Sequence, residues 1–182
     1  MYNFKNTYII VICFLAFISC QGKTENNHES EQQITSPTTR TEKETTVLFD
    51  DDRLNDILSQ YFILRDALTE NDIQQARIAA LLLQEASKNY PQMTNFHQKS
   101  VSLIGKDNID DQRIIFHDLS KELVRLLQEQ KLTPIQGALY IAHCPMAFDD
   151  AGAYWISTGK TIVNPYFGEE MLNCGNITRT IK

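Results

Sequence analysis

The sequence predicts a mainly α fold, an antiparallel up-and-down helical bundle followed by a small, irregular β-hairpin segment. Apolar residues recur at spacings of three and four over about residues 50–130, the period of a helix with one buried face. After Pro134 this period is lost, and short runs rich in aromatic and β-branched residues follow, which favours strands. Because the helices are joined by short connections, consecutive ones are expected to be antiparallel neighbours.

Capping residues and breakers set the expected bounds of the first two helices. The first lies within residues 50–70 and has Asp50 or Asp51 as its N-cap. Asn71 can cap the second, which must end before Pro91 because a proline disfavours helical backbone in the residue before it. The apolar faces expected to be buried are Leu54, Ile57, Leu58, Tyr61, Phe62, Leu64 and Leu68 in the first, and Ile73, Ala76, Ala80 and Leu83 in the second.

Two further helices complete the expected bundle. The third runs over about residues 94–104 and is stopped by Gly105. The fourth begins at Asn108, and Asp111 three positions on resembles a capping box. Its apolar face repeats at heptad-like spacing through Ile109, Gln112, Phe116, Leu119, Leu123 and Leu126.

The last third of the chain predicts short extended elements. Residues 137–145 (GALYIAHCP) favour a strand. Residues 153–157 (AYWIS) and 161–167 (TIVNPYF) are expected to form the hairpin, with Pro165 confining the second strand to an edge. Residues 168–175 (GEEMLNCG) predict one or two helical turns, since acidic residues begin the run and a glycine closes it.

The N-terminus predicts export and lipidation. Lys5 precedes an apolar run over residues 8–18, which is shorter than the ~20 residues that a membrane-spanning helix needs. A small residue and a cysteine follow, so residues 1–19 are expected to be a signal peptide that resembles those of bacterial lipoproteins, with Cys20 as the lipidated first residue. The protein is therefore expected in the envelope of a Gram-negative bacterium, anchored to the membrane by its lipid and facing the periplasm.

Composition separates a tether from one folded domain. Residues 20–49 are polar and have almost no large apolar side chain before the last few positions, so they are expected to form a disordered tether. Residues 50–182 then form a single α-rich domain. Removal of residues 1–19 leaves 16 basic against 23 acidic residues, a net charge of −7. An acidic chain has no general attraction for nucleic acid.

The candidate site is a set of sulfur ligands near the C-terminus. Cys13 is expected to be cut away and Cys20 lipidated, so two thiols remain, and each has a methionine two or three positions away. If the two segments meet, the thiolates and thioethers converge, and soft sulfur ligands of this kind select copper(I). The candidate ligands are Cys144, Met146, Met171 and Cys174, with His143 as an accessory.

The same residues allow a structural interpretation. Two cysteines in an exported domain commonly form a disulfide, here Cys144–Cys174, and the methionines would then fill the core. Unreactive free thiols are a third alternative. A zinc site lacks a clear fourth ligand, and its spacing matches no standard zinc knuckle. The residues by themselves leave these alternatives open.

The same tail carries a resemblance to a known family. Cys-Pro-Met-Ala, Gly-Ala-x-Trp, Asn-Pro-Tyr-Phe-Gly and Met-Leu-x-Cys-Gly follow in order through residues 144–175. This resembles the signature of domain of unknown function 3347, whose helical portion is similar to this chain from about residue 56. Such domains occur as exported lipoproteins and as C-terminal modules of adaptor subunits of copper and silver efflux pumps. The resemblance implies a metal-handling role and efflux-system partners, and it is equally compatible with the disulfide.

The remaining polar and aromatic residues favour structural roles. His97 and His117 lie within the predicted helices, where packed or hydrogen-bonded histidines are usual. The adjacent acids Asp149 and Asp150 are expected to cap a turn or to be solvated. No Ser-His-Asp set, phosphate-binding glycine loop or zinc-protease motif is present, so the protein is not expected to be an enzyme and no catalytic residue is assigned. Aromatic side chains expected to pack the hairpin onto the bundle are Tyr154, Trp155, Tyr166 and Phe167.

Overall fold

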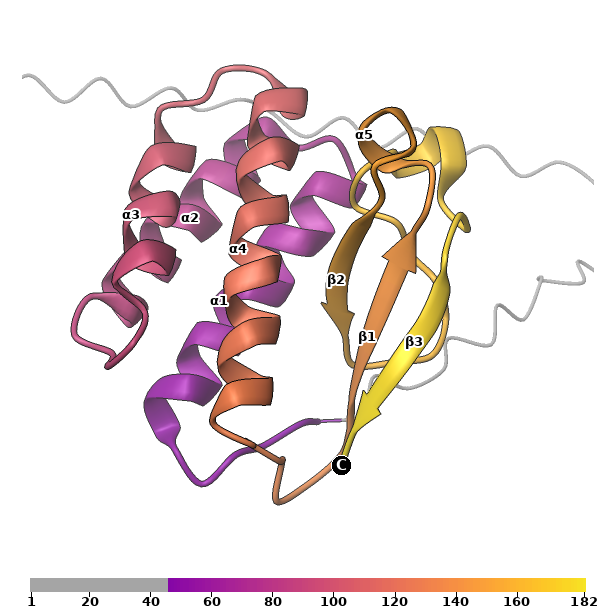
Figure 1. Cartoon of the computed structure of the whole chain (residues 1–182). Coiled ribbons are helices and arrows are strands. Elements are labelled where there is room, and N and C mark those ends of the chain that lie inside the picture. Colours follow the sequence, from indigo (N-terminus) through magenta and orange to yellow (C-terminus); the bar gives the residue numbers. More distant parts are fainter. Residues whose placement is uncertain (1–45) are drawn as a thin grey trace, which may run out of the picture. The chain divides into compact units, whose positions relative to one another are not determined.

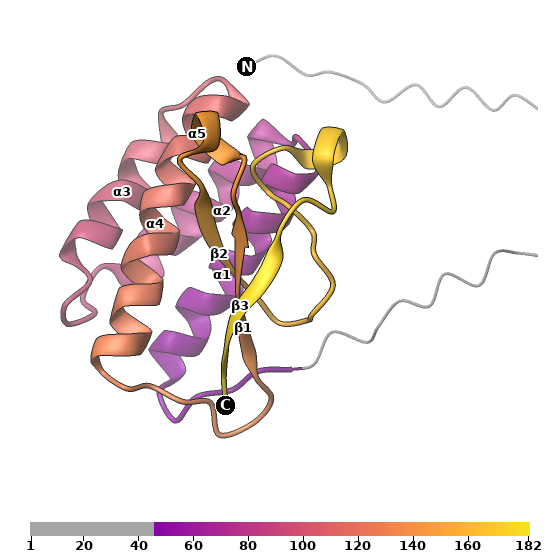
Figure 2. The ribbon, with the colours of Figure 1, turned by 45° about the vertical axis from the view of Figure 1, so that its right-hand side comes forward.

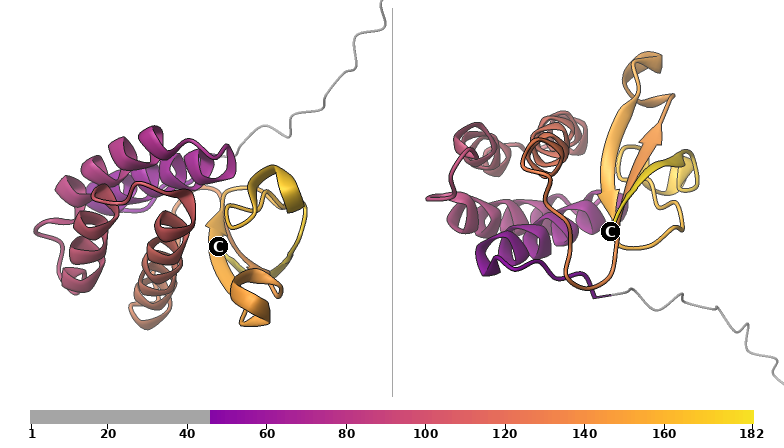
Figure 3. Two further views of the ribbon diagram at one scale, coloured as in Figure 1. Left: turned by 90° about the horizontal axis from the view of Figure 1, so that it is seen from above. Right: turned by 60° about the horizontal axis from the view of Figure 1, so that its bottom comes forward.

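The computed structural model describes residues 46–182 and confirms the mainly α fold. Within this range, helices form one side of the molecule and a three-stranded antiparallel sheet forms the other (Figure 1). The view from above in Figure 3 separates the two layers clearly. The elements are α1 (Asp52–Thr69), α2 (Ile73–Ser87), α3 (Thr94–Ile104), α4 (Ile109–Glu129), β1 (Leu139–Cys144), α5 (Ala147–Asp150), β2 (Ala153–Ser157), the 3₁₀ turn η1 (Gly168–Met171) and β3 (Asn176–Ile181).

The helix caps agree with the sequence except at α2. The side chain of Asp51 accepts hydrogen bonds from the first backbone amides of α1, and that of Asn108 accepts one from Asp111 at 2.8 Å. The cap of α2 is Asp72 and not Asn71. Asn71 has a positive φ of 58°, and its amide oxygen accepts a hydrogen bond from Arg113. The side chain of Asn71, which local spacing assigned to the N-cap of α2, is therefore engaged in a tertiary contact instead.

The expected hairpin has a different partner strand. β2 pairs with β1, and the strand order is β2-β1-β3. The prediction that residues 161–167 form the second strand was wrong, because this run is irregular. Pro165 has no amide to donate, and the side chain of Asn164 accepts a hydrogen bond from the amide of Tyr166 at 2.8 Å, which favours a turn. The third strand, β3, was not predicted, because most of its side chains are exposed and only Ile177 and Ile181 pack against the core.

One hydrophobic core joins the helices to the sheet. Buried side chains of α1, α2, α3 and α4 form a continuous cluster with those of β1 and β2. The hydroxyl of Tyr61 in α1 shares a hydrogen bond of 2.8 Å with Ser120 in α4 and accepts one of 3.1 Å from the amide of Ile156 in β2. The edge strand β2 is thus tied directly to the bundle. Trp155 and Tyr166 are buried as expected, whereas Tyr154 is 42% exposed.

The described residues include the last positions of the expected tether, residues 46–49. Leu48 forms a bridge with Gln136, and Phe49 is buried in the core. The folded part therefore starts before residue 50. The expected signal peptide, the lipidated Cys20 and the tether up to residue 45 lie outside the described residues. Within residues 46–182, no helix combines the length and the apolar character needed to cross a membrane.

Candidate metal centre

The two cysteines of the described region lie side by side. Cys144 ends β1, and Cys174 lies between η1 and β3, thirty positions further along the chain. Their sulfur atoms are 3.1 Å apart, and both cysteines are free. Cys144 is fully buried and Cys174 is half-buried. The fold therefore creates a dithiol in which one sulfur faces the core and the other lies nearer to solvent.

Two neighbouring residues hold Cys174 in this position. The buried side chain of Asn164 donates a hydrogen bond of 2.8 Å to the carbonyl oxygen of Cys174. Gly175 has a φ of 136°, and a Cβ at that position would lie 2.8 Å from the carbonyl oxygen of His143 and 2.9 Å from the ring of Trp155. Only glycine allows both this backbone conformation and this close approach. Residues 174–175 can therefore pass directly over the end of β1.

The environment of the dithiol favours the protonated state of Cys174. Its hydrogen bond with Cys144 raises the pKa of Cys174, and partial burial and the nearby Cys144 charge act in the same direction. Because a metal ion binds the thiolate, binding at this position must release a proton.

The two methionines lie on the surface beside the dithiol rather than in the core. α5 and η1 lie at the same end of the sheet in both Figure 1 and Figure 2. Met146 precedes α5 and is 48% exposed, and Met171 ends η1 and is half-buried. Both line one surface groove of about 630 Å³, and neither cysteine is among its lining residues. The expected four-sulfur set is thus divided into a dithiol and a thioether-lined groove.

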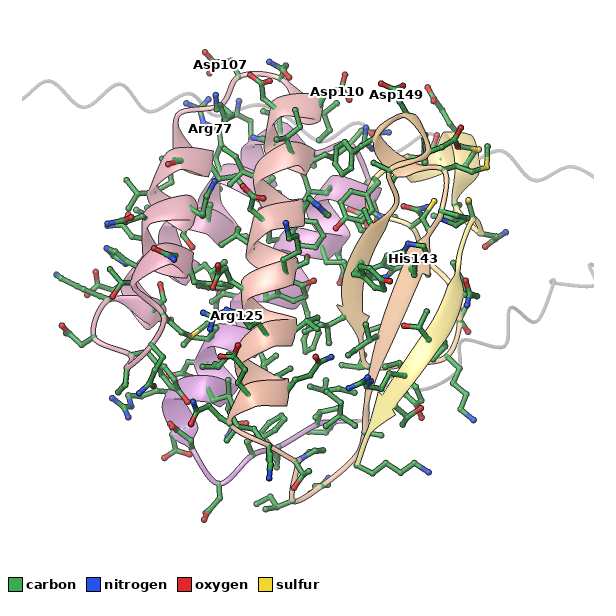
Figure 4. The ribbon with its side chains drawn as sticks, in the orientation of Figure 1. Arg77, Asp107, Asp110, Arg125, His143 and Asp149 are labelled. Atoms are coloured by element: carbon green, nitrogen blue, oxygen red, sulfur yellow. The ribbon has the colours of Figure 1, made fainter. Side chains whose placement is uncertain are left out.

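The structure places His143 away from the dithiol. Successive side chains of a strand point to opposite faces, and Cys144 points into the core. The ring of His143 packs on that of its cross-strand neighbour Tyr154, with ring centroids 4.3 Å apart, and Figure 4 labels it on β1. Among residues 46–182, no group of three or more His, Cys, Asp or Glu side chains is arranged to hold a metal ion.

The segment after Met146 is a strained left-handed turn. Phe148, Asp149 and Asp150 all have φ between 54° and 64°, a region that costs non-glycine residues free energy. The two aspartates are exposed, in accord with the solvated turn expected for them. Figure 4 shows Asp149 at the same end of the molecule as Asp110 of α4.

Arg113 is the residue of this region that the sequence did not single out. Its guanidinium is almost fully buried and donates to the carbonyl oxygens of Pro165 (2.9 Å) and Leu68 (3.2 Å) and to the side chain of Asn71 (2.8 Å). Burial lowers the pKa of Arg113, and the nearby Asp110 opposes this. The partners of Arg113 lie 42 to 52 positions away, so local spacing could not reveal them. The sequence indicated only that Arg113 lies at the edge of the apolar stripe of α4.

The two helical histidines differ in their surroundings. His97 Nδ1 donates a hydrogen bond of 3.0 Å to the carbonyl oxygen of Gln84. His117 packs against Phe148 and Tyr166, and its buried Nδ1 has no hydrogen-bond partner among the described residues. Burial lowers the pKa of His117, assisted by Lys121 and opposed by Asp118.

Comparison with known proteins confirms the resemblance over the helices. Residues 57–134 match the family described as "Protein of unknown function (DUF3347)". The matched range runs from α1 to the residues after α4 and ends before β1, so it does not include the cysteines. No curated protein and no solved structure matches the chain.

Proposed function

We propose, from the match of residues 57–134 to this family and from the pairing of Cys144 with Cys174, that the protein is an exported lipoprotein that binds copper(I). The cysteines are the strong ligands, and the bound ion is passed to or from envelope metal-efflux components. The observation that carries the proposal is the 3.1 Å separation of two free thiols from distant segments. The protein acts by binding and transfer, without catalysis.

The donor set fits a soft monovalent ion. Thiolates bind copper(I) in preference to hard divalent cations. At a metal–sulfur distance of ~2.3 Å, two thiolates stand about 3.8 Å apart at a tetrahedral angle and about 4.6 Å apart in linear two-coordination, whereas these sulfurs are 3.1 Å apart. Binding thus requires the pair to open by about 0.7 to 1.5 Å, with the larger movement for an ion held by the two thiolates alone. The absence of a third His, Cys, Asp or Glu ligand within residues 46–182 favours a low coordination number over a zinc site.

A competition titration tests the metal site. The full chain carrying Cys13→Ser and Cys20→Ser has Cys144 and Cys174 as its only thiols. After reduction it is titrated with copper(I) against a colorimetric copper(I) chelator at micromolar concentration. We expect stoichiometric competition, which is lost when Cys144→Ala and Cys174→Ser are added. If the reduced protein removes no copper from the chelator, the metal-binding proposal fails.

A second candidate is a non-catalytic interaction module stapled by a Cys144–Cys174 disulfide, which docks onto an envelope complex. The short sulfur separation and the lack of a third ligand in the described region favour it. Closing this loop would stabilise the fold by about 3–4 kcal/mol in the chain-entropy model. Counting free thiols in protein isolated from the periplasm separates the two candidates, since the metal site needs the reduced pair and the staple needs the oxidised one.

Export and anchoring are tested separately. We expect the chain to be labelled by a fatty-acid analogue in a Gram-negative host and to fractionate with membranes. Cys20→Ser should abolish labelling, whereas Cys13→Ser should leave it unchanged, because residue 13 lies within the segment expected to be removed. Equal labelling of both variants would contradict lipidation at Cys20.

A further inference from the structure

The groove that contains Met146 and Met171 has the composition of a cation-collecting surface. Phe148, Tyr166 and Phe167 form part of its apolar lining, and Asp110, Asp149 and Asp150 supply carboxylates. The one cationic side chain among its lining residues is Arg113, which forms an ion pair of 3.5 Å with Asp110, so the net negative charge of the groove comes from Asp149 and Asp150. Carboxylates around an apolar depression raise the local concentration of cations.

The two thioethers reach this groove from elements that the fold brings together. Met146 precedes the left-handed turn Phe148–Asp150, and Met171 ends η1. The third methionine of the described region, Met93, is instead fully buried in the helical core. A methionine whose role is only to fill space is expected to be buried in the core, as Met93 is. The strained turn beside Met146 is of the kind that persists at functional sites, where surrounding contacts offset its cost.

The chain connects this groove to the dithiol by very short segments. Met146 is two residues after Cys144, and Met171 is three residues before Cys174. Each thioether is therefore held within a few residues of a thiol, in a groove that neither cysteine lines. Thioethers bind soft cations at any pH because they carry no proton to lose, whereas the thiols must first be deprotonated.

We propose that the groove of Met146 and Met171 is a separate entry site that captures a soft monovalent cation before it passes to Cys144 and Cys174. This inference rests on the proposed function and adds the route to its site. During transfer the ion remains monovalent, so no electron moves. The bonds from the thioethers to the ion break, bonds from the thiolates form, and each thiol that binds releases its proton to water.

Silver(I), supplied as silver nitrate, tests the entry site without redox chemistry. The full chain carries Cys13→Ser, Cys20→Ser, Cys144→Ala and Cys174→Ser and is labelled with ¹³C at its methionine methyls. We expect the Met146 and Met171 methyl resonances to shift together, and that of the buried Met93 to stay in place. Met146→Leu should weaken silver binding by at least about tenfold, because loss of a residue that merely orients a metal ligand already has an effect of this size. Unmoved Met146 and Met171 signals at millimolar silver, or a Met171 shift that appears at the same silver concentration in Met146→Leu as in the parent, would overturn the inference.

A second measurement avoids dependence on the buried Cys144 substitution. In the chain that retains both thiols, the methionine methyls should shift only after the dithiol is saturated. Met146→Leu with Met171→Leu should slow silver uptake several-fold and leave the equilibrium affinity unchanged. A large loss of affinity would show that thioethers and thiolates hold the same ion, which overturns a separate entry site. Failure of the dithiol itself to bind would instead refute the proposed function, whatever the thioethers do.

Discussion

Arg113 Nε donates a hydrogen bond of 2.9 Å to the carbonyl oxygen of Pro165. This contact joins the first turns of α4, within the matched helical region, to the irregular segment that leads to Cys174. The same guanidinium holds the end of α1 through the carbonyl oxygen of Leu68. Gly168 fits against it, since a Cβ there would lie 3.0 Å from the guanidinium. The position of the candidate site therefore depends on a buried cation of the helical bundle.

Replacing Arg113 is expected to destabilise the whole domain. Arg113→Met keeps the aliphatic volume but leaves the buried carbonyl oxygens of Pro165 and Leu68 without this donor, at a cost of about 2–4 kcal/mol. Chemical denaturation measures the change. The matched control is Arg125→Met, because Arg125 lies on the exposed face of α4, where its ion pairs with Glu122 and Glu129 contribute little. Equal effects of the two substitutions would contradict the role of Arg113.

Gly175→Ala is expected to disturb the approach of the two cysteines. The added Cβ would meet the carbonyl oxygen of His143 and the ring of Trp155, at a φ that favours glycine. We expect a loss of more than about 1 kcal/mol in the free energy of unfolding and slower diamide-driven oxidation of Cys144 and Cys174. Gly159→Ala is the control, because no atom lies within 4 Å of its added Cβ. Unchanged oxidation in Gly175→Ala would show that this glycine does not set the thiol geometry.

Stability is expected to fall in alkaline solution because of a buried tyrosine. Burial raises the pKa of Tyr61 to about 12, whereas a phenol in the unfolded chain titrates near 10. Between these values the unfolded state loses a proton that the folded state keeps. Stability therefore decreases as pH rises above about 10, by up to ~1.4 kcal/mol per pH unit for this group.

Tyr61→Phe tests that contribution. The variant loses the hydrogen bonds to Ser120 and Ile156, so we expect it to be less stable at neutral pH by about 1–2 kcal/mol. Its decline above pH 10 should be shallower than that of the parent in urea denaturation at a series of pH values. Tyr166, whose pKa burial also raises well above its ordinary value, would account for the remaining slope. Parallel declines would exclude Tyr61 as the cause.

Acid destabilisation is expected from His117. Because burial lowers the pKa of His117, the unfolded chain takes up a proton near pH 6.5 that the folded chain does not. Stability contributed by the neutral imidazole is thus present above about pH 6.5 and decreases as pH falls towards the folded-state pKa. His117→Phe keeps a ring against Phe148 and Tyr166 and should reduce the fall in melting temperature between neutral and acidic buffer. An unchanged fall would assign the acid sensitivity to other groups.

The helical part of the fold was predictable because its information is local. The spacing of residues such as Leu54, Leu58 and Tyr61 identifies the buried face of α1, and Asn108 with Asp111 marks the start of α4. The sheet was harder, because strand partners are not encoded in neighbouring residues. Residues 161–167 have the composition of a strand, yet contacts made by Asn164 and Tyr166 hold them as a turn, and β1 pairs with β2 instead.

Sequence alone determined which sulfur atoms this protein can use, since it placed a methionine beside each of Cys144 and Cys174. Only the tertiary structure decided that the two thiols meet while Met146 and Met171 line a different surface. The physical reason is that the 29 residues between the cysteines are positioned by buried contacts with distant groups, among them Arg113 with Pro165 and Tyr61 with Ile156. Such contacts cannot be inferred from the spacing of residues along the sequence.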